Sequence, residues 1–207
     1  MMYLPFFPLK LVAFPGEELN LHVFEPRYKE LLADVEENQL TFGICVFTDK
    51  LSGYGTEILL EKVKKRYEDG RLDIQTRGLR VFQILSFDNP APGKLYAGGK
   101  VSFLKNDPVI TSIQHHEFIF YLKEMLHLLN FEMEIDPQSV NSFTFAHKLG
   151  LSLDEELALL QMTSESERTD FLIGHFKRMI PAIKALEIAK EKIKLNGHFK
   201  YLDPLRF

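Results

Sequence analysis

FPLKLVAFPGEELNLHVFEPRYKELL, residues 7–32, changes from a strand pattern to a helix pattern within one short run. Lys10–Phe14 and Glu18–Phe24 are expected to be short strands around the turn Pro15-Gly16, since proline presets φ for a turn and glycine adopts positive φ. In Glu18–Phe24 the apolar residues alternate with polar ones, which is typical of a strand with one buried face. The chain therefore begins with a β structure.

A helix is predicted directly after these strands. Pro26 suits its first turn, where a missing N–H is harmless. Apolar residues then recur at helical spacing on one face, at Tyr28, Leu31, Leu32 and Val35. We expect this helix to end near Asn38.

The rest of the first half has the pattern of further strands. They are expected at Phe42–Phe47, Thr56–Glu68, Arg71–Arg77, Leu79–Phe87 and Tyr96–Leu104. Asp69-Gly70 is a strong hairpin signal, and Gly78 is expected to break the strand in which it lies. Short strands with turn signals at this spacing favour a small barrel or folded sheet.

From about Pro108 the pattern becomes helical. Helices are expected from the capping box Thr111/Gln114 to Leu129, over Ser139–Leu149, over Leu153–Met162 behind the box Ser152/Glu155, and from Ser164 onward. Pro181 should kink or split the last one. We expect the apolar tail His198–Phe207 to pack on the body of the protein. The predicted domains are a β-barrel at 1–107 and a helical bundle with this tail at 108–207.

Composition sets the broad class of the protein. A length of 207 residues with 45% apolar residues fits an ordinary globular protein of one large or two small domains. The net charge of −4 argues against a nucleic-acid partner. Pro5 and Pro8 interrupt any signal-peptide core, and no apolar run is long enough to span a membrane. The single cysteine fits a reducing compartment, so we expect a cytoplasmic protein with no membrane partner.

The opening residues resemble the Lon protease N-terminal (substrate-binding) domain. The matching motifs are Phe7-Pro8-Leu9, Phe14-Pro15-Gly16, Leu21–Tyr28, Phe42-Gly43-Ile44, Gly55-Thr56, Asp69–Leu72 and Gly78–Phe82, in the family's order. The helical half is similar chiefly in Leu149–Ser152 and Glu165–Phe171. The resemblance implies an α+β fold, in which a PUA-like β pseudo-barrel with one early helix is followed by a C-terminal helical bundle.

The resemblance also marks a set of signature residues, which we interpret as mainly structural. They are Pro15, Gly16, Phe24, Glu25, Pro26, Arg27, Tyr28, Gly43, Gly70, Gly78 and Arg80. Glu25 is expected to cap the helix that Pro26 begins, and Arg27 to brace the barrel through a carboxylate. The residues that would bind a polypeptide cannot be named from the sequence.

Three constellations that could carry chemistry have simpler explanations. There is no G-x-x-x-x-G-K-[ST] loop for nucleotide phosphates. His116-Glu117 could begin a zinc motif, but Phe120 stands where the second histidine ligand belongs. Cys45 lies in an apolar strand, as a small core residue would. We therefore expect no catalytic, metal or cofactor residues.

The predicted function is a non-catalytic module that recognises polypeptide substrates, namely unfolded or peptide segments of client proteins, without ATPase or peptidase domains. Two alternatives stay open. One is an RNA-binding PUA-like module, suggested by the fold and by the basic cluster Lys62, Lys64, Lys65 and Arg66, although lysines that protect an edge strand explain this cluster better. The other is an adaptor for a separate ATP-dependent AAA+ protease. The sequence also leaves a homodimer open.

Overall fold

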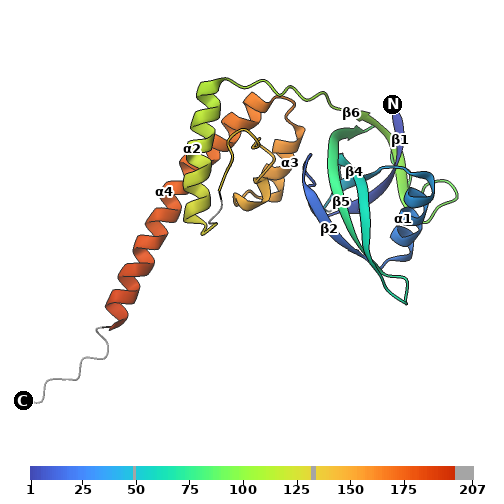
Figure 1. Cartoon of the computed structure of the whole chain (residues 1–207), viewed down its shortest axis with the longest axis horizontal. Helices are drawn as coiled ribbons and strands as arrows, with labels where there is room; N and C mark the ends of the chain where they lie inside the picture. The colour runs from blue at the N-terminus through green and yellow to red at the C-terminus, as the bar shows by residue number, and fades with distance from the viewer. Residues whose placement is uncertain (49, 132–133, 199–207) are drawn as a thin grey trace, which may run out of the picture. The chain divides into compact units, whose positions relative to one another are not determined.

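The computed structural model of the chain describes residues 1–48, 50–131 and 134–198. Figure 1 shows a strand-rich part from the N-terminal half and helices from the C-terminal half. The elements are β1 (Met2–Leu9), β2 (Glu18–Val23), α1 (Pro26–Asn38), β3 (Phe42–Phe47), β4 (Leu51–Arg66), β5 (Leu72–Ile84), β6 (Ala97–Phe103), α2 (Ser112–Leu128), the 3-10 turn η1 (Ala146–Lys148), α3 (Leu153–Gln161) and α4 (Glu165–His198).

In this described part, six strands form one sheet in the order β2-β5-β4-β3-β1-β6. An additional pairing of β5 with β6 closes five of these strands into a ring. β1 and β3 are parallel, and the other pairs are antiparallel. β2 lies outside the ring, on the first half of β5, so the barrel is irregular. The predicted α+β class with a β pseudo-barrel and C-terminal helices is confirmed.

Two strand predictions in this half are wrong. Lys10–Phe14 is not a strand, and the first strand is instead β1, which contains Pro5 and Pro8. Leu4, Phe6 and Phe7 are each at most 5% exposed. The free energy gained by burying them outweighs the cost of the backbone hydrogen bonds that the two prolines cannot donate. Gly78 does not break its strand either, since β5 runs through it from Leu72 to Ile84.

The helix α1 covers one face of the barrel and has the predicted bounds. Its buried face consists of Tyr28, Leu31, Leu32 and Val35, which join the core residues of β3 and β5. The ring of Tyr28 stacks on Phe7 of β1, with 3.8 Å between the ring centroids. This face therefore attaches the helix to the sheet.

The helical half follows the capping signals closely. Both predicted boxes form, at Thr111/Gln114 and at Ser152/Glu155. Pro181 does not split α4, which continues to His198. Ion pairs from α4 to α2 lie on both sides of this proline, Lys177 to Glu117 and Lys184 to Glu124.

The predicted helix Ser139–Leu149 is wrong. This segment consists of turns and the short η1. The Asn141 side chain accepts a hydrogen bond from the Phe143 amide, and the Thr144 hydroxyl accepts one from the Asn141 amide. Such local side-chain bonds compete with helical ones. Most of the predicted apolar tail, residues 199–207, lies outside the described residues.

The chain forms two compact units. The first combines Met1–Val109 with Val140–Arg168, and the second combines Ile110–Ser139 with the chain from Thr169 onward. The predicted domain boundary between residues 107 and 108 stays a prediction. In the described residues, no helix has the length and apolar character needed to cross a membrane.

Candidate functional site

The first unit contains a cleft of about 430 Å³. One wall comes from the barrel and the other from the segment 140–168, with the linker 104–108 beside them. The lining residues are Pro15, Gly16, Leu79, Arg80, Val81, Leu104, Lys105, Asn106, Pro108, Asn141, Phe143, Leu160, Met162, Thr163, Glu165 and Arg168. Four parts of the sequence thus meet at one site.

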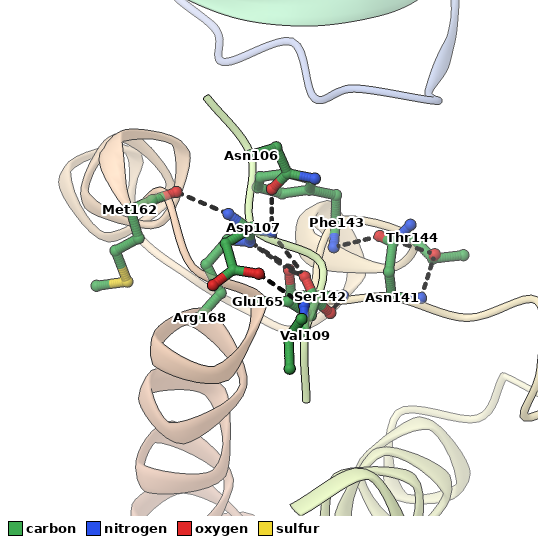
Figure 2. Close-up of polar contacts among 10 residues, drawn as sticks. All are labelled: Asn106, Asp107, Val109, Asn141, Ser142, Phe143, Thr144, Met162, Glu165 and Arg168. Atoms are coloured by element: carbon green, nitrogen blue, oxygen red, sulfur yellow. Dashed lines mark hydrogen bonds and ion pairs between the residues drawn. The ribbon is translucent and has the colours of Figure 1, made fainter. Parts of the chain in front are cut away.

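A buried ion pair supports this cleft (Figure 2). Arg168 and Glu165, one turn apart at the start of α4, are 2% and 8% exposed. The Nη2 of Arg168 lies 2.8 Å from Glu165 Oε2. The other partner of the carboxylate is Ser142, whose amide and hydroxyl donate to it over 2.7 and 2.8 Å. A buried carboxylate needs such partners, because it has lost its water.

The guanidinium of Arg168 also holds three other segments in place. It donates to the Met162 carbonyl and to Asn106 Oδ1, both over 2.7 Å, and to the Ser142 hydroxyl over 2.8 Å. It also lies 4.4 Å from the centroid of the Phe143 ring, close enough for a cation–π contact. One side chain therefore connects the linker, the 142–143 turn and the end of α3.

The linker is fixed by its backbone as well. Asp107 forms a parallel β-bridge with Ser164. The Asp107 amide donates to the Thr163 carbonyl, and the Glu165 amide donates to the Asp107 carbonyl, both over 2.8 Å. The backbone of Asp107, in the linker after β6, is thus bound to the backbone at the start of α4.

On the barrel wall, Arg80 lies between a buried acid and an aromatic ring. Its Nε donates to Glu57 Oε2 over 2.7 Å, and its guanidinium lies 3.8 Å from the centroid of Phe103. The hydrogen bond to Glu57 raises the pKa of Arg80. Glu57 is only 3% exposed and also accepts from the Thr41 hydroxyl. Arg80 therefore neutralises a buried carboxylate while its own side chain stays 56% exposed.

His147 joins the two walls. Its Nε2 lies 3.2 Å from Glu17 beside the Pro15-Gly16 turn, and its Nδ1 lies 2.7 Å from Glu156 of α3. The hydrogen bond to Glu17, followed by the contact with Glu156, raises the pKa of His147 to about 9. The adjacent aromatic contact is between Phe14 and Phe143, with ring centroids 5.3 Å apart. At neutral pH, a charged histidine and a stacked pair thus hold the segment 140–168 against the barrel.

The cleft offers apolar contact and positive charge. Three of its lining residues are cationic, Arg80, Lys105 and Arg168, and one is acidic, Glu165. Cys45 lies elsewhere, in the core, where burial raises the pKa of its thiol. Among the residues that the structure describes, no group of three or more His, Cys, Asp or Glu could hold a metal ion.

Four of the signature residues lie at or beside the cleft. Pro15, Gly16 and Arg80 line it, and Gly78 packs directly behind the Pro15-Gly16 turn. Gly43 instead lies in the barrel core, where a Cβ would stand 2.6 Å from the Phe82 ring.

The other signature residues surround the start of α1 and the hairpin tip. Tyr28 is buried, whereas Phe24 is 59% exposed. The side chain of Glu25 forms no cap, contrary to our prediction. It forms an ion pair with Arg27 instead, over 2.8 Å. The carboxylate that Arg27 contacts therefore belongs to the residue directly before α1. Gly70, at φ +79°, forms the predicted hairpin turn near Lys29.

The basic cluster of β4 makes local contacts. Lys64 donates to Asn20 Oδ1, Arg66 pairs with Glu36, and Lys65 lies over the ring of Tyr67. This end of β4 pairs only with β5 among the described strands, because the pairing with β3 stops at Ile58. This end of β4 is therefore a strand edge, and edge protection by the lysines stays a prediction.

The buried network was missed at the sequence level. Glu165 and Arg168 have the spacing of an ion pair on one helix turn, which usually indicates an exposed surface pair. Nothing in the local sequence indicates that Ser142 and Asn106 approach them.

Comparison with known proteins agrees with this fold. The model of the ATP-dependent protease La (LON) substrate-binding domain matches residues 3–178. A Lon N-terminal domain protein from Xanthomonas campestris is 27% identical, with a TM-score of 0.67 over 84% of this chain and 98% of that one. The N-terminal domain of Mycobacterium avium complex Lon protease has the same fold, at 16% identity and a TM-score of 0.64, over 85% and 98% of the two chains. No curated protein sequence matches.

The fold is thus that of a Lon N-terminal domain. The chain belongs to the Lon substrate-binding domain family, as the match over residues 3–178 shows.

Proposed function

We propose that this protein is a non-catalytic recognition module that holds unfolded or extended segments of client proteins. The observation that carries the proposal is the family match, because it covers residues 3–178 and its description is a substrate-binding domain. The cleft of the first unit is the proposed contact site. In this proposal its residues contribute recognition alone.

The cleft supports this proposal by its size and composition. Its volume of about 430 Å³ lies within the range of about 300–1,000 Å³ that is usual for ligand sites. Apolar side chains from both walls, including Leu79 and Met162, line it. It can therefore accept a few side chains of an extended peptide.

The test uses one client in two states. Reduced, carboxymethylated α-lactalbumin is permanently unfolded, whereas native α-lactalbumin presents the same composition in a folded form. We expect the purified protein to bind the unfolded form and not the native form in isothermal titration calorimetry. Absence of binding to this and to a panel of other unfolded clients would overturn the proposal.

The non-catalytic part of the proposal has its own test. Unfolded α-lactalbumin incubated with the protein, with and without ATP and Mg²⁺, should stay intact by mass spectrometry. A cleavage activity that co-purifies with the protein through several columns would contradict it.

A cytoplasmic location and cooperation with a separate AAA+ protease complete the proposal. Affinity capture from a cytosolic extract, followed by proteomics, should recover such a protease above a control with an unrelated protein. Recovery of RNA in place of protein would favour the alternative function.

A further inference from the structure

The cleft lining combines apolar and cationic side chains. Leu79, on the barrel wall, is 37% exposed and presents an aliphatic side chain. Lys105, on the linker, is exposed at the rim. Both residues line the same cleft, so a short peptide segment bound there can contact an apolar side chain and a cation together.

The positive charges of the cleft are not equally available. Arg168 is neutralised by Glu165 below the surface. Arg80 uses its Nε for Glu57, and its two Nη groups have no other acceptor among the described residues. In the same described ranges, no carboxylate pairs with Lys105. Lys105 and the outer face of Arg80 thus remain to receive an incoming anion.

The rest of the protein has the opposite charge. The whole chain carries −4, whereas the cleft lining carries three cations and one acid, and Glu57 behind Arg80 brings the local balance to one positive charge. Attraction for an acidic ligand is therefore local to this cleft, and the remaining surface would repel it weakly.

We propose that the cleft selects peptide segments in which an apolar side chain stands next to a carboxylate. The apolar side chain packs against Leu79, and the carboxylate pairs with Lys105 and the Nη groups of Arg80. This inference rests on the proposed function and names the class of segment that the module prefers. A peptide carboxylate complements the charge of Lys105 and the Nη groups of Arg80.

The test compares three fluorescein-labelled peptides of equal length: GSFELDFSG, GSFQLNFSG and GSFKLKFSG. They share their apolar residues and differ only at the two positions that carry the charge. By fluorescence anisotropy, we expect the acidic peptide to bind tightest and the basic peptide weakest. The advantage of the acidic peptide should shrink as salt is added, because exposed charge pairs are screened.

Two pairs of variants locate the binding. Lys105→Glu should weaken the acidic peptide about fivefold, the scale of losing one exposed ion pair and gaining a repulsion. Lys100→Glu, which reverses an exposed lysine of β6 outside the cleft, should leave it unchanged. Leu79→Ser should weaken all three peptides alike, whereas Leu85→Ser, also exposed but outside the cleft, should not. Thermal unfolding of each variant checks that it is folded.

The outcomes separate the inference from the proposed function. If unfolded α-lactalbumin binds but the acidic peptide has no advantage, or Lys105→Glu changes nothing, the inference fails and the recognition function stands. If neither the protein client nor any peptide binds, both fail. If an oligouridylate competes with the acidic peptide at equal or lower concentration, the cleft is a site for nucleic acid, and the inference is overturned.

Discussion

Gly78 of β5 lies against the carbonyl group of Phe14, so closely that a Cβ at position 78 would overlap the carbonyl oxygen. Two backbone hydrogen bonds hold this contact, from the Gly16 amide to the Gly78 carbonyl over 2.8 Å and from the Gly78 amide to the Glu17 carbonyl over 2.9 Å. The turn that forms one edge of the cleft is therefore bound directly to the middle of β5. Glycine is needed at position 78 for close approach rather than for a special φ.

Replacing Gly78 by alanine should destabilise the protein by about 1–3 kcal/mol, because the added methyl group must push the Phe14–Glu17 turn away. Urea unfolding followed by circular dichroism measures the change. Gly174→Ala is the matched control, since a Cβ there would lie 3.6 Å from Nη1 of Arg178, an ordinary contact distance, and alanine is the better helix former. Equal stability of the two variants would contradict the close contact.

Cys45 should be chemically silent in the folded protein. It is 0% exposed, and burial raises the pKa of its thiol, so very little reactive thiolate is present. We expect Ellman's reagent at pH 8 to label it only after denaturant is added. Rapid labelling of the native protein, at the rate of a free cysteine, would place the thiol at the surface and reopen a nucleophilic role for it.

Local sequence signals were sufficient for elements whose hydrogen bonds are local. The bounds of α1 follow from Pro26 and an apolar face. The capping boxes Thr111/Gln114 and Ser152/Glu155 each satisfy the backbone amides of their own helix. The hairpin at Asp69-Gly70 needs only a residue that accepts positive φ. Such features depend on few neighbours, so a single sequence predicts them.

The cleft could not be predicted in the same way. Its walls join the turn at Pro15, the strand at Leu79, the linker at Lys105 and the helix start at Arg168. These residues are far apart in the sequence and meet only through tertiary packing. The error at 139–149 has a related cause, because Ser142 gives its amide to Glu165 rather than to a helix.

Removing the charge of Arg168 should destabilise the first unit strongly. Arg168→Met would leave the Glu165 carboxylate buried without its cation, a change that costs about 3–5 kcal/mol in comparable pairs. Urea unfolding measures the loss, and Arg178→Met, an exposed arginine on the same helix, is the control. The double variant Arg168→Met/Glu165→Leu should recover part of the stability, since both charges of this pair are then gone. A single variant as stable as the control would show that the network contributes little.

His147 should make stability depend on pH. Its pKa is raised from 6.5 to about 9 by the hydrogen bond to Glu17 and the contact with Glu156. The folded state therefore keeps a proton on His147 up to a higher pH than the unfolded state does. The contribution of this group to the free energy of unfolding is full below pH 6.5 and is lost as the pH rises through about 9. The difference in urea midpoint between the wild type and His147→Gln should accordingly shrink over this interval. His116→Gln, on the exposed surface of α2, controls for the loss of a histidine. A difference that stays constant from pH 6.5 to 9 would mean that His147 holds the two walls without its charge.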